Sequence, residues 1–238
     1  MSLIYASALI ALGLIPSFAW LFFYTREDLR HPEPKKILLL SFLSGGVVTF
    51  LVLPIQIFLN KNLPQIGIVN YSFLSFLFLG AIEEIFKFLA VYIFIHRRRE
   101  FDEPLHAMIY MITAALGFAA VENVASLFQA SQGSILNIAI AESLTLRFIG
   151  ATLLHTLSSG FVGYYWSLAF VKGATGFSLR HERELHPIIK GLLIATVLHA
   201  IFNYLIIKTG PATLAIVYVV FAALFLLGDF EKLKKEDI

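Results

Sequence analysis

The chain has 238 residues, of which 58% are hydrophobic and only 14% are charged, and its formal net charge is +2. A soluble domain carries charged side chains at about a quarter of its positions, and a core of this size cannot enclose so much apolar surface. The composition therefore excludes an ordinary soluble protein. The small charge gives no sign of a nucleic-acid-binding surface, and the absence of cysteine excludes disulfides, thiolate metal sites and a cysteine nucleophile.

Seven apolar stretches are long enough to cross a membrane, which takes about 20 mostly apolar residues. In chain order they are residues 3–24, 36–59, 71–95, 104–129, 142–171, 187–208 and 211–229. The first lacks the basic leader of a signal peptide, so we expect it to remain as a helix. The fifth is longer than a bilayer requires, which predicts a tilt, an extension or a break. The sequence thus predicts an all-α, polytopic membrane bundle of about seven transmembrane helices, forming a single integral membrane domain over residues 1–238.

Basic residues are distributed unevenly between the two sets of loops. Thirteen Lys and Arg residues fall in the loops after the first, third and fifth stretches and in the C-terminal tail, whereas the opposite side carries only Lys61 and Lys208. Cytoplasmic loops are enriched in Lys and Arg. We therefore expect the C-terminus in the cytoplasm and the N-terminus outside.

Polar side chains interrupt the third to sixth stretches, although a charged side chain at the centre of a bilayer costs about 2.5–3.5 kcal/mol. Counting from the ends of each stretch places most of them at one depth, between the midplane and the outer leaflet. This shared depth predicts that four helices meet around one water-filled site. Arg147 lies near the outer end of its stretch, and we expect its head group to snorkel toward the surface. The polar residues are Glu83, Glu84, Lys87, Glu122, Asn123, Arg147, His155, His199 and Asn203.

Spacing within single helices supports the same site. His199 and Asn203 are four residues apart and share one helical face. Lys87 follows Glu84 by three residues and Glu83 by four, so it can neutralise one carboxylate and leave the other for acid–base work. Ser159 and Gly163 form a pair of small residues four apart, which is more typical of helix packing than of a nucleophile.

Carboxylates, two histidines and an amide can bind and activate a water molecule. The sequence contains neither the His-Glu-x-x-His helix of many zinc proteases nor a Gly-x-Ser-x-Gly turn. A glutamate can accept the proton of the water, while His and Asn stabilise the oxyanion. Two histidines and a carboxylate are also a catalytic zinc ligand set, here His155, His199 and Glu122. Both mechanisms stay open at this point.

Four short segments in separate stretches resemble the PrsW family of intramembrane proteases, within the superfamily of the CAAX prenyl endopeptidases. They are EEIFK at 83–87, GFAAVEN at 117–123, GFVGYY at 160–165 following His155, and HAIFNY at 199–204, and they extend over roughly half of the chain. The resemblance implies an intramembrane endopeptidase in a prokaryotic cell membrane. It also implies the site residues Glu83, Glu84, Glu122, His155, His199 and Asn203.

The resemblance further implies a substrate and a cofactor. The family is commonly described as metal-dependent, which suggests a divalent metal such as zinc, while related prenyl-protein peptidases are described as glutamate-dependent. PrsW is associated with cleavage of a membrane-bound anti-sigma factor on its extracytoplasmic side. The expected partners are thus the lipid bilayer and a membrane-anchored protein or peptide substrate.

Two rival functions use the same residues. A proton- or cation-coupled transporter needs intramembrane carboxylates and histidines, but it also predicts an internal repeat or broken helices, and the sequence contains no evident repeat. A silent scaffold that kept the fold would tolerate loss of Glu84 or His199.

Overall fold

The computed structural model describes residues 2–27, 33–131, 138–171, 182–208 and 212–236, and within these ranges it is helical with no strand. The all-α prediction is therefore confirmed. In chain order the elements are α1 (Leu3–Glu27), α2 (Lys35–Asn62), the 3-10 turn η1 (Leu63–Ile66), α3 (Phe73–Phe94), α4 (Pro104–Ala130), α5 (Ile138–Leu146), the π-helical turn η2 (Arg147–Ala151), α6 (Thr152–Val171), α7 (Glu182–Lys208) and α8 (Ala212–Glu236).

Each of the seven predicted stretches corresponds to one helical segment, and the fifth is the continuous run α5–η2–α6. Among the described residues, α1, α2, α4, α7 and α8 are long and apolar enough to cross a membrane. The helix α3 differs because three charged residues interrupt its middle. The break that the length of the fifth stretch suggested is a π-helical turn.

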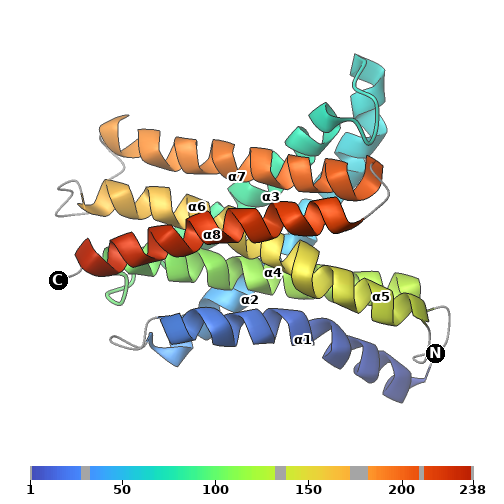
Figure 1. Ribbon diagram of the computed structural model, residues 1–238, viewed down its shortest axis with the longest axis horizontal. Helices are drawn as coiled ribbons and strands as arrows, with labels where there is room; N and C mark the ends of the chain where they lie inside the picture. The colour runs from blue at the N-terminus through green and yellow to red at the C-terminus, as the bar shows by residue number, and fades with distance from the viewer. Residues whose placement is uncertain (1, 28–32, 132–137, 172–181, 209–211, 237–238) are drawn as a thin grey trace.

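The helix α4 forms the centre of the bundle (Figure 1). It packs against α1, α2 and α6, while α7 packs against α3 and α6, and α8 covers α6 and α7. The sequence of α4 is rich in Ala and contains Gly117, and small residues of this kind let neighbouring backbones approach closely. A Cβ on Gly117 would lie 1.8 Å from the carbonyl oxygen of Phe42, and a Cβ on Gly45 would lie 1.8 Å from that of Ala114. The backbones of α2 and α4 therefore touch at two reciprocal glycines.

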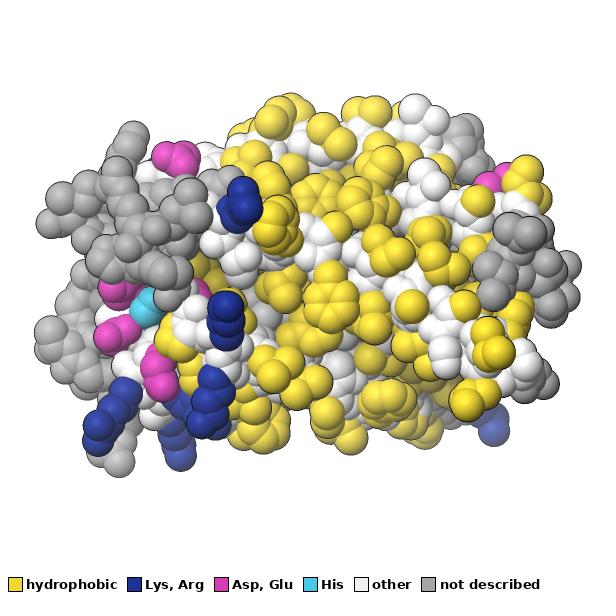
Figure 2. All heavy atoms as spheres, turned by 90° about the horizontal axis from the view of Figure 1, so that it is seen from below, with side chains coloured by type: hydrophobic (Ala, Val, Ile, Leu, Met, Phe, Trp, Pro, Cys, Tyr) yellow, Lys and Arg dark blue, Asp and Glu magenta, His cyan; other side chains and the backbone are white. Residues whose placement is uncertain are grey.

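The outer surface is apolar over its middle (Figure 2). Large hydrophobic side chains such as Phe50, Ile57 and Phe58 of α2 are more than half exposed. On the face that Figure 2 shows, charged side chains gather toward the end of the molecule that holds the C-terminus. An exposed apolar band of this kind is the surface that lipid chains cover, so the chain is an integral membrane protein.

Three aromatic rings pack together near the C-terminal end of α3. Trp166 of α6 is fully buried, and its ring centroid lies 5.0 Å from that of Phe88 and 5.1 Å from that of Phe101. Phe88 directly follows Lys87 on α3. We call Phe88, Phe101 and Trp166 the aromatic layer; it joins α3, the segment before α4, and α6.

Candidate active site

Three charged side chains of α3 point into the bundle. Glu83, Glu84 and Lys87 are all buried, although each is ionisable. The Lys87 ammonium donates a hydrogen bond of 2.8 Å to Glu84 Oε1 and lies 3.6 Å from Glu83 Oε2. It also lies 4.5 Å from the ring centroid of Phe118 on α4, a cation–π contact. The i+3 and i+4 spacing thus forms the expected ion pair, with Glu84 as the closer partner.

His199 of α7 connects the two glutamates. Its Nδ1 lies 3.1 Å from Glu84 Oε1, and its Nε2 lies 3.5 Å from Glu83 Oε2. Gly80 permits this approach, because a Cβ at that position would lie only 3.2 Å from the Cβ of His199. In the neutral ring with its proton on Nδ1, Nε2 is an acceptor. It then faces the carboxylate oxygen of Glu83 with no proton between them.

His155 of α6 also faces Glu83, and we call the space among Glu83, His155 and His199 the gap. Its Nδ1 is 2.8 Å from the Lys87 ammonium, which is a donor only, so Nδ1 accepts and Nε2 carries the proton. That Nε2 donates over 2.9 Å to Glu122 Oε2 on α4. Nδ1 also lies 3.8 Å from Glu83 Oε2. Glu122 therefore fixes both the tautomer of His155 and the nitrogen that faces Glu83.

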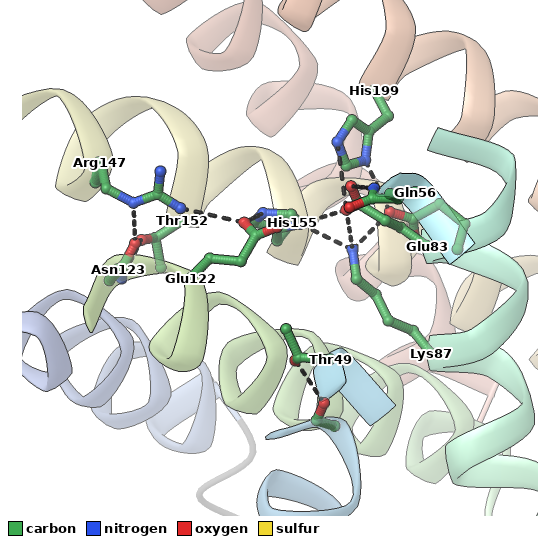
Figure 3. Close-up of polar contacts among 12 residues, drawn as sticks. Thr49, Gln56, Glu83, Lys87, Glu122, Asn123, Arg147, Thr152, His155 and His199 are labelled. Atoms are coloured by element: carbon green, nitrogen blue, oxygen red, sulfur yellow. Dashed lines mark hydrogen bonds and ion pairs between the residues drawn. The ribbon is translucent and has the colours of Figure 1, made fainter. Parts of the chain in front are cut away.

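The two adjacent glutamates have different surroundings, and Figure 3 labels Glu83 with its partner Gln56. Both oxygens of Glu84 are used, since Oε1 accepts from Lys87 and His199, and Oε2 accepts from Ser159 over 3.0 Å. Glu83 Oε1 accepts from Gln56 of α2 over 2.7 Å. Its Oε2 is buried and has no hydrogen-bond partner among the described residues. This oxygen therefore faces the gap that the two histidines border.

Arg147, the first residue of η2, lies beside this group. Its Nε donates over 2.5 Å to Asn123 Oδ1, and one terminal nitrogen donates over 3.1 Å to Glu122 Oε2. The snorkelling that we expected for Arg147 is wrong, because the guanidinium points inward to α4 and contacts Glu122. Asn123 also donates to Thr152 over 3.0 Å, which joins α4 to α6.

The structure brings most of the predicted site residues together, and they come from four helices. Asn203 lies one turn beyond His199 on α7, is partly exposed, and makes no side-chain hydrogen bond with the described residues. Sequence reasoning missed Gln56 and read Ser159 as a packing residue. Gln56 could have been found as a lone amide within an apolar helix. Ser159 lies one turn after His155, so a shared face was visible in the spacing. The predicted residues in mutual contact are Glu83, Glu84, Lys87, Glu122, His155 and His199.

Four of these side chains could hold a metal ion. Donor atoms of Glu83, Glu84, His155 and His199 all lie within 4.8 Å of one another. Neighbouring ligands of a tetrahedral zinc are about 3.4 Å apart, given bonds of about 2.0–2.1 Å. The distances from Glu83 Oε2 to the histidine nitrogens, 3.5 and 3.8 Å, are close to this separation. The ligand set differs from the predicted one, because Glu122 contacts the far edge of His155 and Glu83 takes its place.

The charges of the site also favour a cation. Three carboxylates, those of Glu83, Glu84 and Glu122, face two permanent cations, Lys87 and Arg147. With neutral histidines the group therefore has one negative charge in excess. A buried excess charge is costly unless a proton or a cation compensates it. Glu83 Oε2 accepts no hydrogen bond from the described residues, so a proton or a cation would fit beside this oxygen.

These features define a class of protein: a helical membrane protein with buried carboxylates and histidines at its centre, side chains of the kind that a membrane-embedded hydrolase uses. Comparison with known proteins specifies the class further. Residues 33–228 match the family described as PrsW family intramembrane metalloprotease, and the chain belongs to this family. The resemblance found in the sequence is thus confirmed.

Proteins named Protease PrsW are similar to the chain over most of its length. The protein of Geobacillus kaustophilus is 29% identical over 201 residues, which are 84% of this chain and 80% of that relative. The protein of Clostridioides difficile is 26% identical over 226 residues, or 94% and 90% of the two chains. The protein of Bacillus subtilis is 27% identical over 199 residues, or 84% and 83%. No solved structure is significantly similar to the chain.

Proposed function

We propose that the chain hydrolyses a peptide bond of a membrane-anchored protein, using a water molecule activated in the gap between Glu83, His155 and His199. One observation carries this proposal: the buried Oε2 of Glu83 has no hydrogen-bond partner in the part of the chain that the structure describes, and it faces both histidines. A water in this gap would meet a proton acceptor on one side and imidazole nitrogens on the other. Membership of an intramembrane protease family supports the reaction class.

Glu83, rather than Glu84, is the proposed general base. Its free oxygen can accept a proton, whereas each oxygen of Glu84 already accepts a hydrogen bond. Gln56 holds the other oxygen of Glu83 and so fixes the direction of the free one. Glu84 would act indirectly, because it anchors Lys87 and His199 at the edge of the gap.

The remaining side chains position the reacting groups. Glu122 holds the Nε2 edge of His155 and so keeps Nδ1 toward the gap. Asn203 shares the face of His199, and its amide, which has no partner among the described residues, is the proposed donor to the oxyanion. These roles explain why an amide and two histidines accompany the carboxylates.

A divalent cation such as zinc fits the same gap, and Glu83, His155 and His199 would hold it. When bound, such an ion supplies a Lewis acid and lowers the pKa of its water. Its binding needs the Nδ1 lone pair of His155, which Lys87 now occupies. Lys87 and the ion therefore compete for one nitrogen.

The proposed substrate is a protein with a single membrane span, such as an anti-sigma factor. The aromatic layer packs against α3 one residue after Lys87, toward the C-terminal end of that helix. If that end is cytoplasmic, as the loop charges indicate, the site opens toward the extracytoplasmic side. We therefore propose cleavage on that side, an N-terminus outside, and one catalytic domain over residues 1–238.

The test is a cleavage assay with the purified protein in proteoliposomes, offered a library of single-span membrane proteins from the same source. Glu83→Gln should abolish cleavage, while Glu142→Gln, at an exposed glutamate of α5, should leave it intact. Loss of cleavage with a chelator as well would identify a metallopeptidase, and insensitivity to the chelator would identify a glutamate-activated water. A wild-type protein that cleaves nothing, with or without added zinc, would overturn the proposal.

A further inference from the structure

The composite helix that carries His155 contains a π-helical turn at Arg147–Ala151. A π turn accommodates one extra residue within an α-helix, and such turns occur frequently at functional sites. An α-helix turns by about 100° per residue, so two residues eight apart would point about 80° away from each other. One extra residue reduces the effective separation to seven, and the angle to about 20°. The π turn therefore brings Arg147 and His155 to nearly the same face.

Both side chains then reach the same atom. Glu122 Oε2 accepts from Arg147 over 3.1 Å and from His155 Nε2 over 2.9 Å (Figure 3). A second bond, from Arg147 Nε to Asn123 Oδ1, fixes the plane of the guanidinium. The side chains of Arg147 and Glu122 are only 20% and 26% exposed. Partial burial strengthens this ion pair relative to one in water.

We propose that Arg147 is a positioning residue for hydrolysis: it holds the Glu122 carboxylate against His155 and so fixes which nitrogen of His155 faces the gap. This role rests on the proposed function, although the contact itself does not. Arg147 contacts Glu122 and Asn123 rather than the metal-binding donor atoms of Glu83, Glu84, His155 and His199, so it acts through Glu122. Its charge also compensates Glu122 and leaves the excess negative charge on the Glu83 side.

A purely structural role would be to join α4 to α6. That connection already exists without Arg147, because Asn123 donates to Thr152 Oγ1 over 3.0 Å. Thr152 is fully buried, and its hydroxyl bonds to Asn123 rather than to the guanidinium. Thr152→Val therefore provides a matched control that weakens the connection between α4 and α6 but leaves the Arg147–Glu122 pair.

The kinetic test compares Arg147→Gln, Arg147→Lys and Thr152→Val in the cleavage assay. Loss of a group that orients a catalytic ligand typically costs about 10–100-fold in activity. Arg147→Gln should lower kcat by that factor with KM changed less than about twofold, and Arg147→Lys should recover part of the loss because it keeps the charge but not the fork of donors. Deletion of Ile149, which restores an α-helical register, should lower kcat as Arg147→Gln does.

A double-mutant cycle distinguishes positioning from general damage. In a Glu122→Gln background, Arg147→Gln should lower kcat by less than a further factor of about two, because its target is already altered. Equal losses in both backgrounds, or a loss that appears in KM rather than in kcat, would overturn the proposal. So would a loss of kcat in Thr152→Val as large as that in Arg147→Gln.

A readout without activity completes the test. The ring nitrogens of His155 can be observed by NMR in protein labelled with ¹⁵N-histidine and assigned with His155→Gln. Arg147→Gln should shift the Nε2 signal, and Thr152→Val should leave it in place. An unchanged signal in Arg147→Gln would overturn the role of Arg147. If the wild-type protein cleaves nothing, the proposed function fails, and the NMR shift alone decides whether Arg147 positions His155.

Discussion

Two buried polar groups lie along α4, and they differ in how histidines approach their carboxylates. The first is the candidate active site. The second, which we call the loop cluster, consists of Glu33, His106 and Tyr110 near the start of α4. Tyr110 donates its hydroxyl proton to Glu33 Oε2, and His106 Nε2 lies 3.0 Å from Glu33 Oε1. His106 Nδ1 accepts from the backbone N–H of Glu103 over 3.1 Å, so the proton of the ring lies on Nε2.

The loop cluster has one carboxylate, and each of its oxygens faces a donor. The site has three carboxylates for two permanent cations and leaves Glu83 Oε2 without a hydrogen bond. Burial and polarity are common to both groups, and neither Glu33 Oε1 nor Glu83 Oε2 accepts a hydrogen bond from the described residues. The difference is that Glu33 Oε1 lies 3.0 Å from one histidine, whereas Glu83 Oε2 lies 3.5 and 3.8 Å from two histidines of different helices. The comparison teaches that an unsatisfied acceptor alone does not single out a candidate reactive centre, and that two histidines from different helices converging on one carboxylate oxygen do so better.

The strongest way to test this contrast is Glu83→Gln. The substitution keeps the size and the bond to Gln56 but removes the proton acceptor, so kcat should fall by about 10²–10⁴-fold, the usual contribution of general acid–base catalysis. Cleavage of a single-span substrate and the melting temperature should be measured together. A mutant that melts like the wild type and cleaves at the wild-type rate would remove Glu83 from the mechanism.

Glu33→Gln tests the other side of the contrast. An amide cannot face both Tyr110 and His106 with an oxygen as the carboxylate does, and a buried group left unsatisfied costs about 1–3 kcal/mol. The melting temperature in detergent should fall by several degrees, whereas kcat per folded molecule should stay within about twofold of the wild type. Tyr110→Phe is the matched control, since it removes one donor from the same carboxylate. A large loss of kcat at unchanged melting temperature would mean that the loop cluster takes part in the reaction.

A smaller effect is expected for Ser159→Ala. Ser159 only donates to Glu84 Oε2, and a single hydrogen bond contributes about 1 kcal/mol, or roughly fivefold in rate. Cleavage should therefore be slowed by less than about tenfold. Complete loss of cleavage, with trapping of a covalent serine adduct in the wild type, would instead identify Ser159 as a nucleophile.

The smallest effect concerns His96, which lies just beyond α3. Burial, and to a lesser extent the neighbouring charge of Arg97, lower the pKa of His96 below its ordinary value. The unfolded chain then binds the proton more readily than the folded protein does, so stability is full above about pH 6.5 and declines as the pH falls below it. His96→Phe, which keeps the stacking on Tyr92, should flatten this dependence. Melting temperatures measured between about pH 8 and about pH 5.5 test it.

The sequence predicted the helices and the composition of the site because both depend on strong, local signals. An apolar run of membrane length is unmistakable, and Glu83, Glu122, His155 and His199 stand out because charged or polar groups are costly there. Counting depth along each helix was enough to expect that they meet.

The details that decide chemistry were not predictable in the same way. One extra residue at a π turn leaves the hydropathy of a helix unchanged, so the inward direction of Arg147 could not be read from the sequence. Which of Glu83 and Glu84 keeps a free oxygen depends on Gln56 and Ser159, which are brought there by other helices. Which side chains of different helices hydrogen-bond to one another depends on how the helices pack, and that packing depends on close contacts such as those at Gly45 and Gly117.

The aromatic layer beside the site has a consequence for the energy metabolism of the cell. Ionisable groups and water halfway through a bilayer offer protons a path across it, and a cell that stores energy as a proton gradient cannot tolerate such a leak. Phe88, which directly follows Lys87 on α3, packs against Trp166, and Trp166 packs against Phe101. If hydrolysis takes place at the site as proposed, such rings would limit the path that protons could follow from the site along the bundle.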